Sequence, residues 1–286
     1  MTQNMPQKQK TKLVPVLREP ALLTERDADK SPVLECIDLG ITFGGLKAVD
    51  NFNVTIGRTE ITGLIGPNGA GKTTVFNLLT KVYQPTHGTI LLNGKDIHDL
   101  NTAQVNRAGI ARTFQNIRLF GELSVEENIT VAMDTQMHYT MPEGIFRLPR
   151  FWKEERIVHE RAMELLSIFH MEDLAKAKAS SLPYGAQRRL EILRALATNP
   201  SLLLLDEPAA GMNPSETAEL MENIRSIRDT FKIAVLLIEH DMNLVMNICE
   251  GIAVLNFGHV IAKGTPEDIQ NNPEVIEAYL GKQKEA

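Results

Sequence analysis

The sequence predicts an α/β protein in which a parallel core sheet carries an antiparallel β edge and a helical subdomain. Three short runs without a charged residue predict the core strands, namely Ile61 to Ile65, Leu202 to Leu205 and Ala234 to Ile238. Uncharged runs of this length are typical of parallel strands buried on both faces. Each run gives way to a glycine loop or to charged side chains, and in open α/β sheets ligands bind at the carboxyl ends of the strands. We therefore expect three distant parts of the chain to bring functional groups to one edge.

An antiparallel edge is predicted from two extended regions on either side of the first core strand. The region from Val33 to Ile56 is broken at Gly44-Gly45, and its last residues alternate as in a half-buried strand. Residues 89 to 97 contain Asn93-Gly94 between two extended pieces, which is the strongest short signal for a hairpin turn. Together these pieces are expected to form the antiparallel edge.

The middle of the chain, from about residue 100 to 198, has the pattern of a helical subdomain. Residues 124 to 127 have the spacing of a capping box, which marks a helix start. A later segment places Met163, Leu166 and Phe169 on one helical face. With 286 residues and no internal repeat, the chain fits one core with a subsidiary lobe.

Composition and charge narrow the possible functions. The formal net charge of −6 argues against a nucleic-acid-binding protein, because such proteins gather Lys and Arg on one face. Cys36 and Cys249 have the spacing of neither a disulfide framework nor a zinc site, so we expect small core residues in a reducing compartment. No run approaches the roughly 20 apolar residues that span a bilayer, and the start lacks an apolar run that could direct secretion. A cytoplasmic location is therefore expected.

Residues 1 to 31 are predicted to form a flexible extension, because they are mostly polar with a slight excess of basic side chains. An arm that binds a membrane surface or a partner is the alternative that this composition leaves open. The folded domain is then expected to run from residue 32 to 286.

The residues after the first core strand match a pattern that binds phosphate. Gly66 to Thr73 reads G-x-x-x-x-G-K-[ST] and stands between a predicted strand and the helical run Thr74 to Leu79. The glycines let backbone N–H groups turn inward around phosphate oxygens, and the helix start adds its positive dipole end. Lys72 is expected to reach the β- and γ-phosphates, and Thr73 to offer its hydroxyl to Mg²⁺. The predicted ATP-binding residues of this loop are Gly66, Pro67, Asn68, Gly69, Ala70, Gly71, Lys72, Thr73 and Thr74.

Two further strand ends add carboxylates and an imidazole to the same edge. Asp206 and Glu207 follow one uncharged run, and His240 stands just after another. Beside a phosphate loop, Asp206 can hold Mg²⁺ through its water shell, and Glu207 can take a proton from an attacking water. We expect His240 to contact the γ-phosphate. Helix capping by the carboxylates and a structural histidine are the alternatives.

Five motifs follow one another in a fixed order along the chain. They are the phosphate loop, Thr113-Phe114-Gln115-Asn116, Leu182-Pro183-Tyr184-Gly185-Ala186-Gln187-Arg188-Arg189, Leu205-Asp206-Glu207-Pro208 and Ile238-Glu239-His240-Asp241. This order resembles the ATP-binding-cassette (ABC) family from Val33 to about Lys263. The resemblance implies a RecA-like P-loop NTPase core, followed by a C-terminal segment at about 264–286. It also implies a head-to-tail dimer, in which each ATP lies between the phosphate loop of one subunit and the signature segment, residues 182–187, of the other.

The resemblance assigns further roles residue by residue. Phe43 is similar to the aromatic residue that stacks on adenine, and Gln115 to the glutamine that senses Mg²⁺ and the attacking water. The residues expected to be catalytic are Glu207, His240 and Gln115, and those expected to hold Mg²⁺ are Thr73, Gln115 and Asp206. Without the resemblance, Phe43 would equally suit the core at a strand end, and Gln115 would be a surface amide.

The signature segment is expected to bind the ATP of the partner subunit through Tyr184, Gly185, Ala186 and Gln187. It departs from the common form Leu-Ser-Gly-Gly-Gln, because Pro183 replaces the serine and Ala186 replaces the glutamine. The serine hydroxyl is therefore missing as a phosphate donor. We hypothesise a heterodimer of two related ATPases with non-equivalent sites, with a homodimer as the alternative for the isolated chain.

Within the family, the sequence is similar to the ATPases of branched-chain amino acid importers. The similarity lies in the Leu-Pro-Tyr-Gly signature, the stretch Ala209 to Pro214, Glu239 to Met242, and the ending Asn272 to Gly281. It implies membrane permeases, a second ATPase and a periplasmic or extracellular binding protein as partners, with this chain peripheral on the inner face of the cell membrane. The insertion at residues 134 to 156 is either a surface loop or a permease contact.

Three other functions remain open from the sequence. An ATPase for lipopolysaccharide or lipid export would have a closely similar cassette. A soluble ABC ATPase of DNA repair or translation typically has two cassettes or a long coiled coil, and neither pattern is present. A regulatory nucleotide-binding module is less consistent with Glu207 beside Asp206, because that pair favours turnover.

Overall fold

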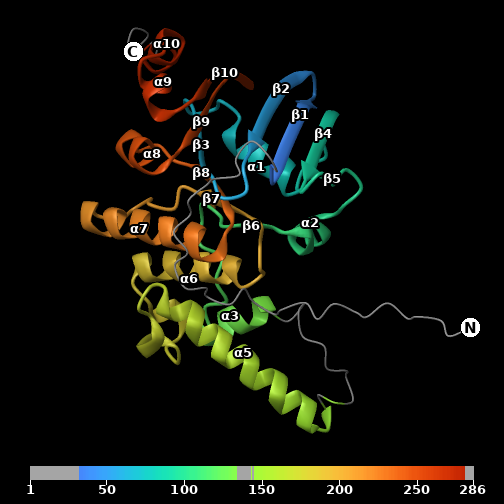
Figure 1. The fold of residues 1–286 in the computed structure, drawn as a ribbon, viewed down its shortest axis with the longest axis vertical. Helices are drawn as coiled ribbons and strands as arrows, with labels where there is room; N and C mark the ends of the chain where they lie inside the picture. Colours follow the sequence, from blue (N-terminus) through green and yellow to red (C-terminus); the bar gives the residue numbers. More distant parts are fainter. Residues whose placement is uncertain (1–31, 134–142, 144, 281–286) are drawn as a thin grey trace, which may run out of the picture.

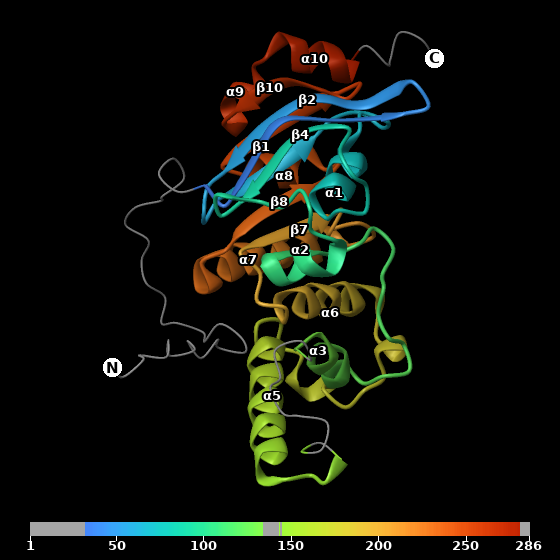
Figure 2. The same ribbon diagram turned by 90° about the vertical axis from the view of Figure 1, so that its right-hand side faces the viewer.

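The computed structural model describes residues 32–133, 143 and 145–280 (Figure 1). The extension predicted at residues 1–31 and the first part of the predicted insertion lie outside the described residues. Two sheets and their helices form one end of the molecule, and a group of helices around α5 forms the other (Figure 2).

The core sheet has six strands in the order β10-β9-β3-β8-β7-β6. Their bounds are β3 Ile61–Ile65, β6 Ile110–Arg112, β7 Leu202–Asp206, β8 Ala234–Ile238, β9 Gly251–Asn256 and β10 His259–Gly264. The five strands from β9 to β6 are parallel, and only β10 pairs antiparallel at one edge. β3, β8 and β7 are fully buried neighbours at the centre. The three strands predicted from uncharged runs are thus confirmed, with their carboxyl ends at one edge.

The predicted antiparallel edge is a separate four-stranded sheet in the order β2-β1-β4-β5. Its strands are β1 Leu34–Phe43, β2 Leu46–Ile56, β4 His87–Leu92 and β5 Lys95–Asp96. The breaks at Gly44-Gly45 and Asn93-Gly94 fall where the sequence places them. Helix α1, Lys72–Leu79, buries Val75, Phe76 and Leu79 in a cluster that includes residues of both sheets. Full burial of such a side chain stabilises the fold by about 1.5–3 kcal/mol, so this packing fixes the helix that follows the phosphate loop.

The helical subdomain contains α3 Val125–Met133, α5 Pro149–Ser167 and α6 Tyr184–Leu196. The capping box is confirmed, because the Ser124 N–H donates to Glu127 Oε2 at 2.7 Å and the Glu127 N–H donates to Ser124 Oγ at 3.2 Å. The uniformly helical interpretation of residues 100–198 is wrong at its start. After α2, Thr102–Ala108, strand β6 joins the core sheet beside β7. A three-residue strand leaves no periodic pattern in the sequence, and only its pairing defines it.

The remaining helices are α7 Pro214–Phe231, α8 Met242–Ile248, α9 Pro266–Gln270 and α10 Pro273–Leu280. The short α8 begins two residues after the predicted catalytic histidine, and α9 and α10 follow β10 (Figure 1). Both cysteines are free and buried, as predicted. Within the described ranges, no helix is both long and apolar enough to cross a membrane.

Candidate active site

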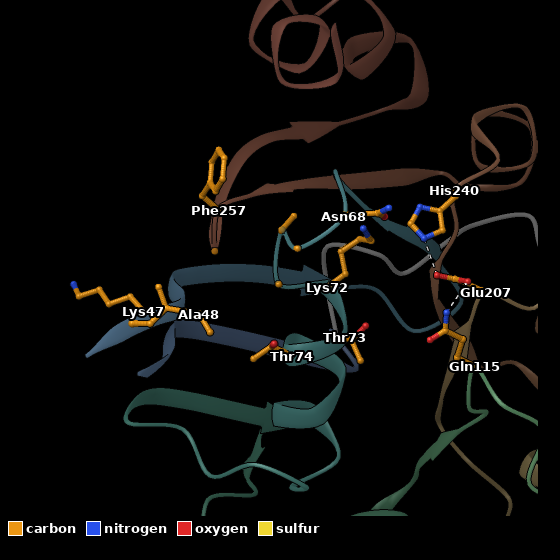
Figure 3. Close-up of a pocket in the computed structure, with 15 residues that line it drawn as sticks. Lys47, Ala48, Asn68, Lys72, Thr73, Thr74, Gln115, Glu207, His240 and Phe257 are labelled. Carbon is orange, nitrogen blue, oxygen red and sulfur yellow. Dashed lines mark hydrogen bonds and ion pairs between the residues drawn. The ribbon is translucent and has the colours of Figure 1, made fainter. Parts of the chain in front are cut away.

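A cavity of about 620 Å³ lies at the carboxyl ends of the core strands, beside the start of β2. Figure 3 shows the phosphate loop on one side of it and the groups after β7 and β8 on the other. The lining residues are Leu46, Lys47, Ala48, Asn68, Gly69, Ala70, Gly71, Lys72, Thr73, Thr74, Gln115, Glu207, His240, Phe257 and Gly258.

The backbone of the phosphate loop requires glycine at two positions. Gly66 has φ 150°, and a Cβ there would lie 2.0 Å from the Leu255 carbonyl oxygen. Gly71 has φ 107°, and its Cβ would lie 2.8 Å from the Ala48 carbonyl oxygen. Larger residues would therefore push the loop away from β9 or β2. The loop keeps its shape because neighbouring strands contact its backbone directly.

Lys72 is the first residue of α1 and has only 6% of its surface exposed. Its Nζ donates to the carbonyl oxygens of Gly66, at 2.6 Å, and Pro67, at 3.0 Å. These two predicted binding residues thus hold the lysine rather than line the cavity, whereas residues 68–74 all line it. A phosphate group at the start of α1 would meet the positive end of the helix together with an ammonium group already held beside it.

Three predicted catalytic side chains meet at the opposite wall. Gln115 Nε2 donates to Glu207 Oε2 at 3.2 Å, and His240 Nε2 lies 2.7 Å from Glu207 Oε1 (Figure 3). Glu207 has φ 49°, an uncommon backbone conformation for a residue with a side chain, and its N–H donates to the Ile238 carbonyl at 2.9 Å. Left-handed backbone of this kind is concentrated at functional sites, where the surrounding structure holds it.

Asp206 lies behind this wall and does not line the cavity. It is 3% exposed, and its Oδ2 accepts from Arg112 Nη2 at 2.8 Å. Arg112 also donates to Asn77 Oδ1 at 2.7 Å, and its guanidinium lies 5.3 Å from the centre of the Phe76 ring and 5.1 Å from that of Phe114. No local sequence pattern points to Arg112, because its partners lie 35 and 94 residues away.

A magnesium ion fits this site only together with phosphate oxygens. Among the described residues, no group of three or more His, Cys, Asp or Glu side chains could hold a metal. Thr73 and Gln115 line the cavity and offer oxygen atoms, which are the ligands that Mg²⁺ prefers. With few protein ligands, Mg²⁺ keeps several waters and binds substrate phosphates, and this arrangement allows that mode.

The predicted adenine-stacking residue is not part of the lining. Phe43 is 44% exposed, and its ring packs edge-on against Tyr83 with a centroid distance of 5.2 Å. The aromatic residue that does line the cavity is Phe257, in the turn between β9 and β10. Phe257 is 80% exposed, and its ring points away from the phosphate loop in Figure 3. The stacking role of Phe43 therefore stays a prediction.

We expect Phe43→Ala to weaken MgATP binding by about tenfold, because one stacked base contributes about 1–3 kcal/mol. Phe257→Ala is the matched control, and its exposed ring should change the dissociation constant less than twofold. Titration calorimetry with a non-hydrolysable ATP analogue measures both variants. A loss confined to Phe257→Ala would contradict the prediction and place the base beside the β9–β10 turn.

The predicted signature residues lie away from the cavity, at the start of α6. Tyr184 is 48% exposed, whereas Ala186 is buried at 5% and offers at most its backbone to a ligand. The Gln187 amide donates to the Leu182 carbonyl at 2.8 Å. The signature residues therefore do not contact the phosphate loop of their own chain.

Two contacts near the site were missed by sequence reasoning. Glu239 is 6% exposed and accepts the N–H groups of Ala209, at 2.9 Å, and His240, at 3.2 Å. Burial raises the pKa of its carboxyl group. Burial raises the pKa of Tyr279 in α10 and the Gly66 backbone opposes this shift, so the C-terminal helix lies against the first residue of the phosphate loop. Neither contact has a local sequence signal.

Comparisons with known proteins agree with this geometry. A family model described as "ABC transporter" matches residues 49–210, and one described as "Branched-chain amino acid ATP-binding cassette transporter" matches residues 259–285. The high-affinity branched-chain amino acid transport ATP-binding protein BraF of Pseudomonas aeruginosa is 48% identical over 250 residues, covering 87% of this chain and 98% of that protein. The LivG protein of Escherichia coli, of the same description, is 49% identical with the same coverage. The crystal structure of the ADP conformation of an ABC transporter cassette matches with a TM-score of 0.76 and 30% identity, covering 87% of this chain and 99% of that one.

Proposed function

This chain belongs to the ATP-binding-cassette transporter family, and we propose that it binds and hydrolyses ATP to power the uptake of branched-chain amino acids through partner permeases. One observation carries the catalytic part: the cavity brings the phosphate loop and Lys72 opposite Glu207, with Gln115 and His240 bonded to that carboxylate. The substrate class follows from relatives at 48–49% identity that are described as branched-chain amino acid transport proteins.

Each residue has a distinct task in hydrolysis. Lys72 leaves the loop carbonyls and binds the β- and γ-phosphates, where its charge offsets the negative charge of the transferred group. Glu207 accepts a proton from the attacking water, and Gln115 and His240 hold its two carboxylate oxygens in place. Thr73 and Gln115 would hold Mg²⁺ from the cavity side, and Asp206 through a water. The ion neutralises charge on the phosphates when it is bound.

The position of the signature segment supports a dimer. Tyr184 and Gly185 lie away from the chain's own phosphate loop, which supports a role toward a nucleotide held by another subunit. The altered segment, with Pro183 in place of serine, supports a second, related ATPase as that subunit. The assembly then contains membrane permeases and depends on an external binding protein, with this chain on the inner face of the membrane.

Uptake of radiolabelled leucine tests the proposal. Cells that lack the gene should lose high-affinity uptake and regain it with the wild-type chain but not with Glu207→Gln. Co-purification of the chain from membranes should recover permeases and a second ATPase. Unchanged leucine uptake together with a defect in lipopolysaccharide export would contradict the import function and favour the lipid-export alternative.

A further inference from the structure

The loop that carries Gln115 is held by two buried charged side chains of α6. Arg188 and Glu191 are 3% and 2% exposed, and they stand one turn apart on the helix that begins with the signature segment. Arg188 Nη1 donates to the Phe114 carbonyl at 2.7 Å, and Nη2 donates to the Gln115 carbonyl. Glu191 Oε1 accepts the N–H groups of Phe114, at 3.2 Å, and Arg118, at 3.4 Å.

Arg188 and Glu191 form most of their hydrogen bonds with the loop backbone and not with each other. The direct contact between Arg188 Nη1 and Glu191 Oε2 is 3.4 Å, so it is no shorter than any of the bonds to the loop. Burial raises the pKa of Glu191, opposed by the Phe114 N–H and by the charge of Arg188. A buried ion pair is weak evidence for a gain in stability. The two side chains instead hold the loop around Gln115 in place, because Arg188 binds its carbonyl oxygens and Glu191 binds its N–H groups.

Arg188 also reaches the signature segment. Its Nε donates to the Tyr184 hydroxyl at 3.2 Å, and its guanidinium lies 5.4 Å from the centre of the Tyr184 ring. The Tyr184 ring also lies beside Gly211, where a Cβ would be 3.2 Å from it. Tyr184 is thus held between α6 and the loop that follows Glu207.

We propose that Arg188, supported by Glu191, is a positioning residue that connects Tyr184 of the signature segment to Gln115 of the same subunit. The hydrogen-bonded path runs from Tyr184 through Arg188 to the Gln115 backbone, and from the Gln115 amide to Glu207. The inference rests on the proposed function, in which the signature segment serves the nucleotide of the partner subunit. A shift of α6 when that nucleotide binds moves Gln115, so each site is set by the occupancy of the other.

Arg188→Lys in the complete transporter tests this inference. Lysine keeps the charge, but a single ammonium cannot hold two carbonyls and a hydroxyl in the planar geometry of a guanidinium. We expect kcat for ATP to fall by about tenfold or more, because small displacements of a catalytic group are costly. The dissociation constant for MgATP should stay within twofold, since the phosphate loop is unchanged. Arg161→Lys is the matched control, because Arg161 lies on α5 and pairs with Glu164 away from the Gln115 loop, and it should retain wild-type kcat.

A double-variant cycle tests the path to the signature segment. If Tyr184 acts through Arg188, the variant with Tyr184→Phe and Arg188→Lys should lose no more kcat than Arg188→Lys alone. Fully multiplied losses, or a kcat for Arg188→Lys within twofold of wild type, would overturn the inference. The Phe114 and Arg118 amides donate to Glu191, so hydrogen exchange at both should rise in Glu191→Ala without nucleotide, and unchanged exchange would also overturn the inference. Failure of the wild-type chain to bind MgATP would instead overturn the proposed function.

Discussion

Replacement of Lys72 by alanine should abolish transport and weaken MgATP binding by about 100-fold, which corresponds to about 2.7 kcal/mol. The ammonium group is buried at the start of α1, where it is held 2.6 Å from the Gly66 carbonyl and can turn toward a bound phosphate. Its loss removes the charge while the glycine-rich backbone stays in place. Calorimetric titration with a non-hydrolysable ATP analogue measures the affinity, and leucine uptake measures the function.

The matched control for Lys72→Ala is Lys95→Ala, an exposed lysine of β5 that does not line the cavity. It removes the same charge and should leave affinity and uptake close to wild type. If Lys72→Ala leaves both quantities unchanged, the assignment of the cavity to a Mg-nucleotide is wrong.

Glu207→Gln should lower kcat for ATP by about 10²–10⁴-fold, the contribution that a positioned general base makes to proton transfer. Glutamine keeps the size of the side chain and can still bond to Gln115 and His240, but it cannot accept the proton of the attacking water. The dissociation constant for MgATP should stay within about threefold, because the phosphate loop and Lys72 are untouched. Phosphate release measures turnover, and titration measures binding.

Glu239→Gln is the internal control, because this carboxyl group stands at the same sheet edge but accepts two backbone N–H groups. It should retain turnover, with a lower melting temperature because a buried acceptor is altered. Equal losses of kcat in Glu207→Gln and Glu239→Gln would contradict the assignment of the base. In a complex with the second ATPase, Glu207→Gln in this chain and the equivalent change in the other should reduce hydrolysis unequally. Equal reductions would count against two non-equivalent sites.

The sequence was sufficient to predict an element where a short local pattern is compatible with only one kind of structure. Uncharged runs predicted β3, β7 and β8, and the Asn93-Gly94 turn predicted the β4–β5 hairpin. The phosphate loop and the groups after β7 and β8 were predicted at one edge, and Lys72, Glu207 and His240 do line one cavity. β6 was missed because three residues carry no periodicity.

Side-chain partners far apart in the chain were outside the reach of sequence patterns. Arg112 pairs with Asp206 across 94 residues, and Arg188 reaches Phe114 across 74 residues. The position of Phe43 against Tyr83 likewise depends on how the β1–β2 turn meets the loop after α1.

The sequence by itself determined the identity of the reacting groups and their placement at strand ends. Local backbone preferences and the burial of uncharged runs depend on residues that are neighbours in the sequence, so strands, turns and the phosphate loop can be predicted from it. Only the tertiary structure decided which groups contact one another. It places Gln115 and His240 in hydrogen-bonding contact with Glu207, and it pairs the buried Asp206 with Arg112. It also bonds α6 to the loop that carries Gln115. Those contacts depend on how β6, β7, β8 and α6 pack against one another, because residues far apart in the sequence come within bonding distance only in the folded protein.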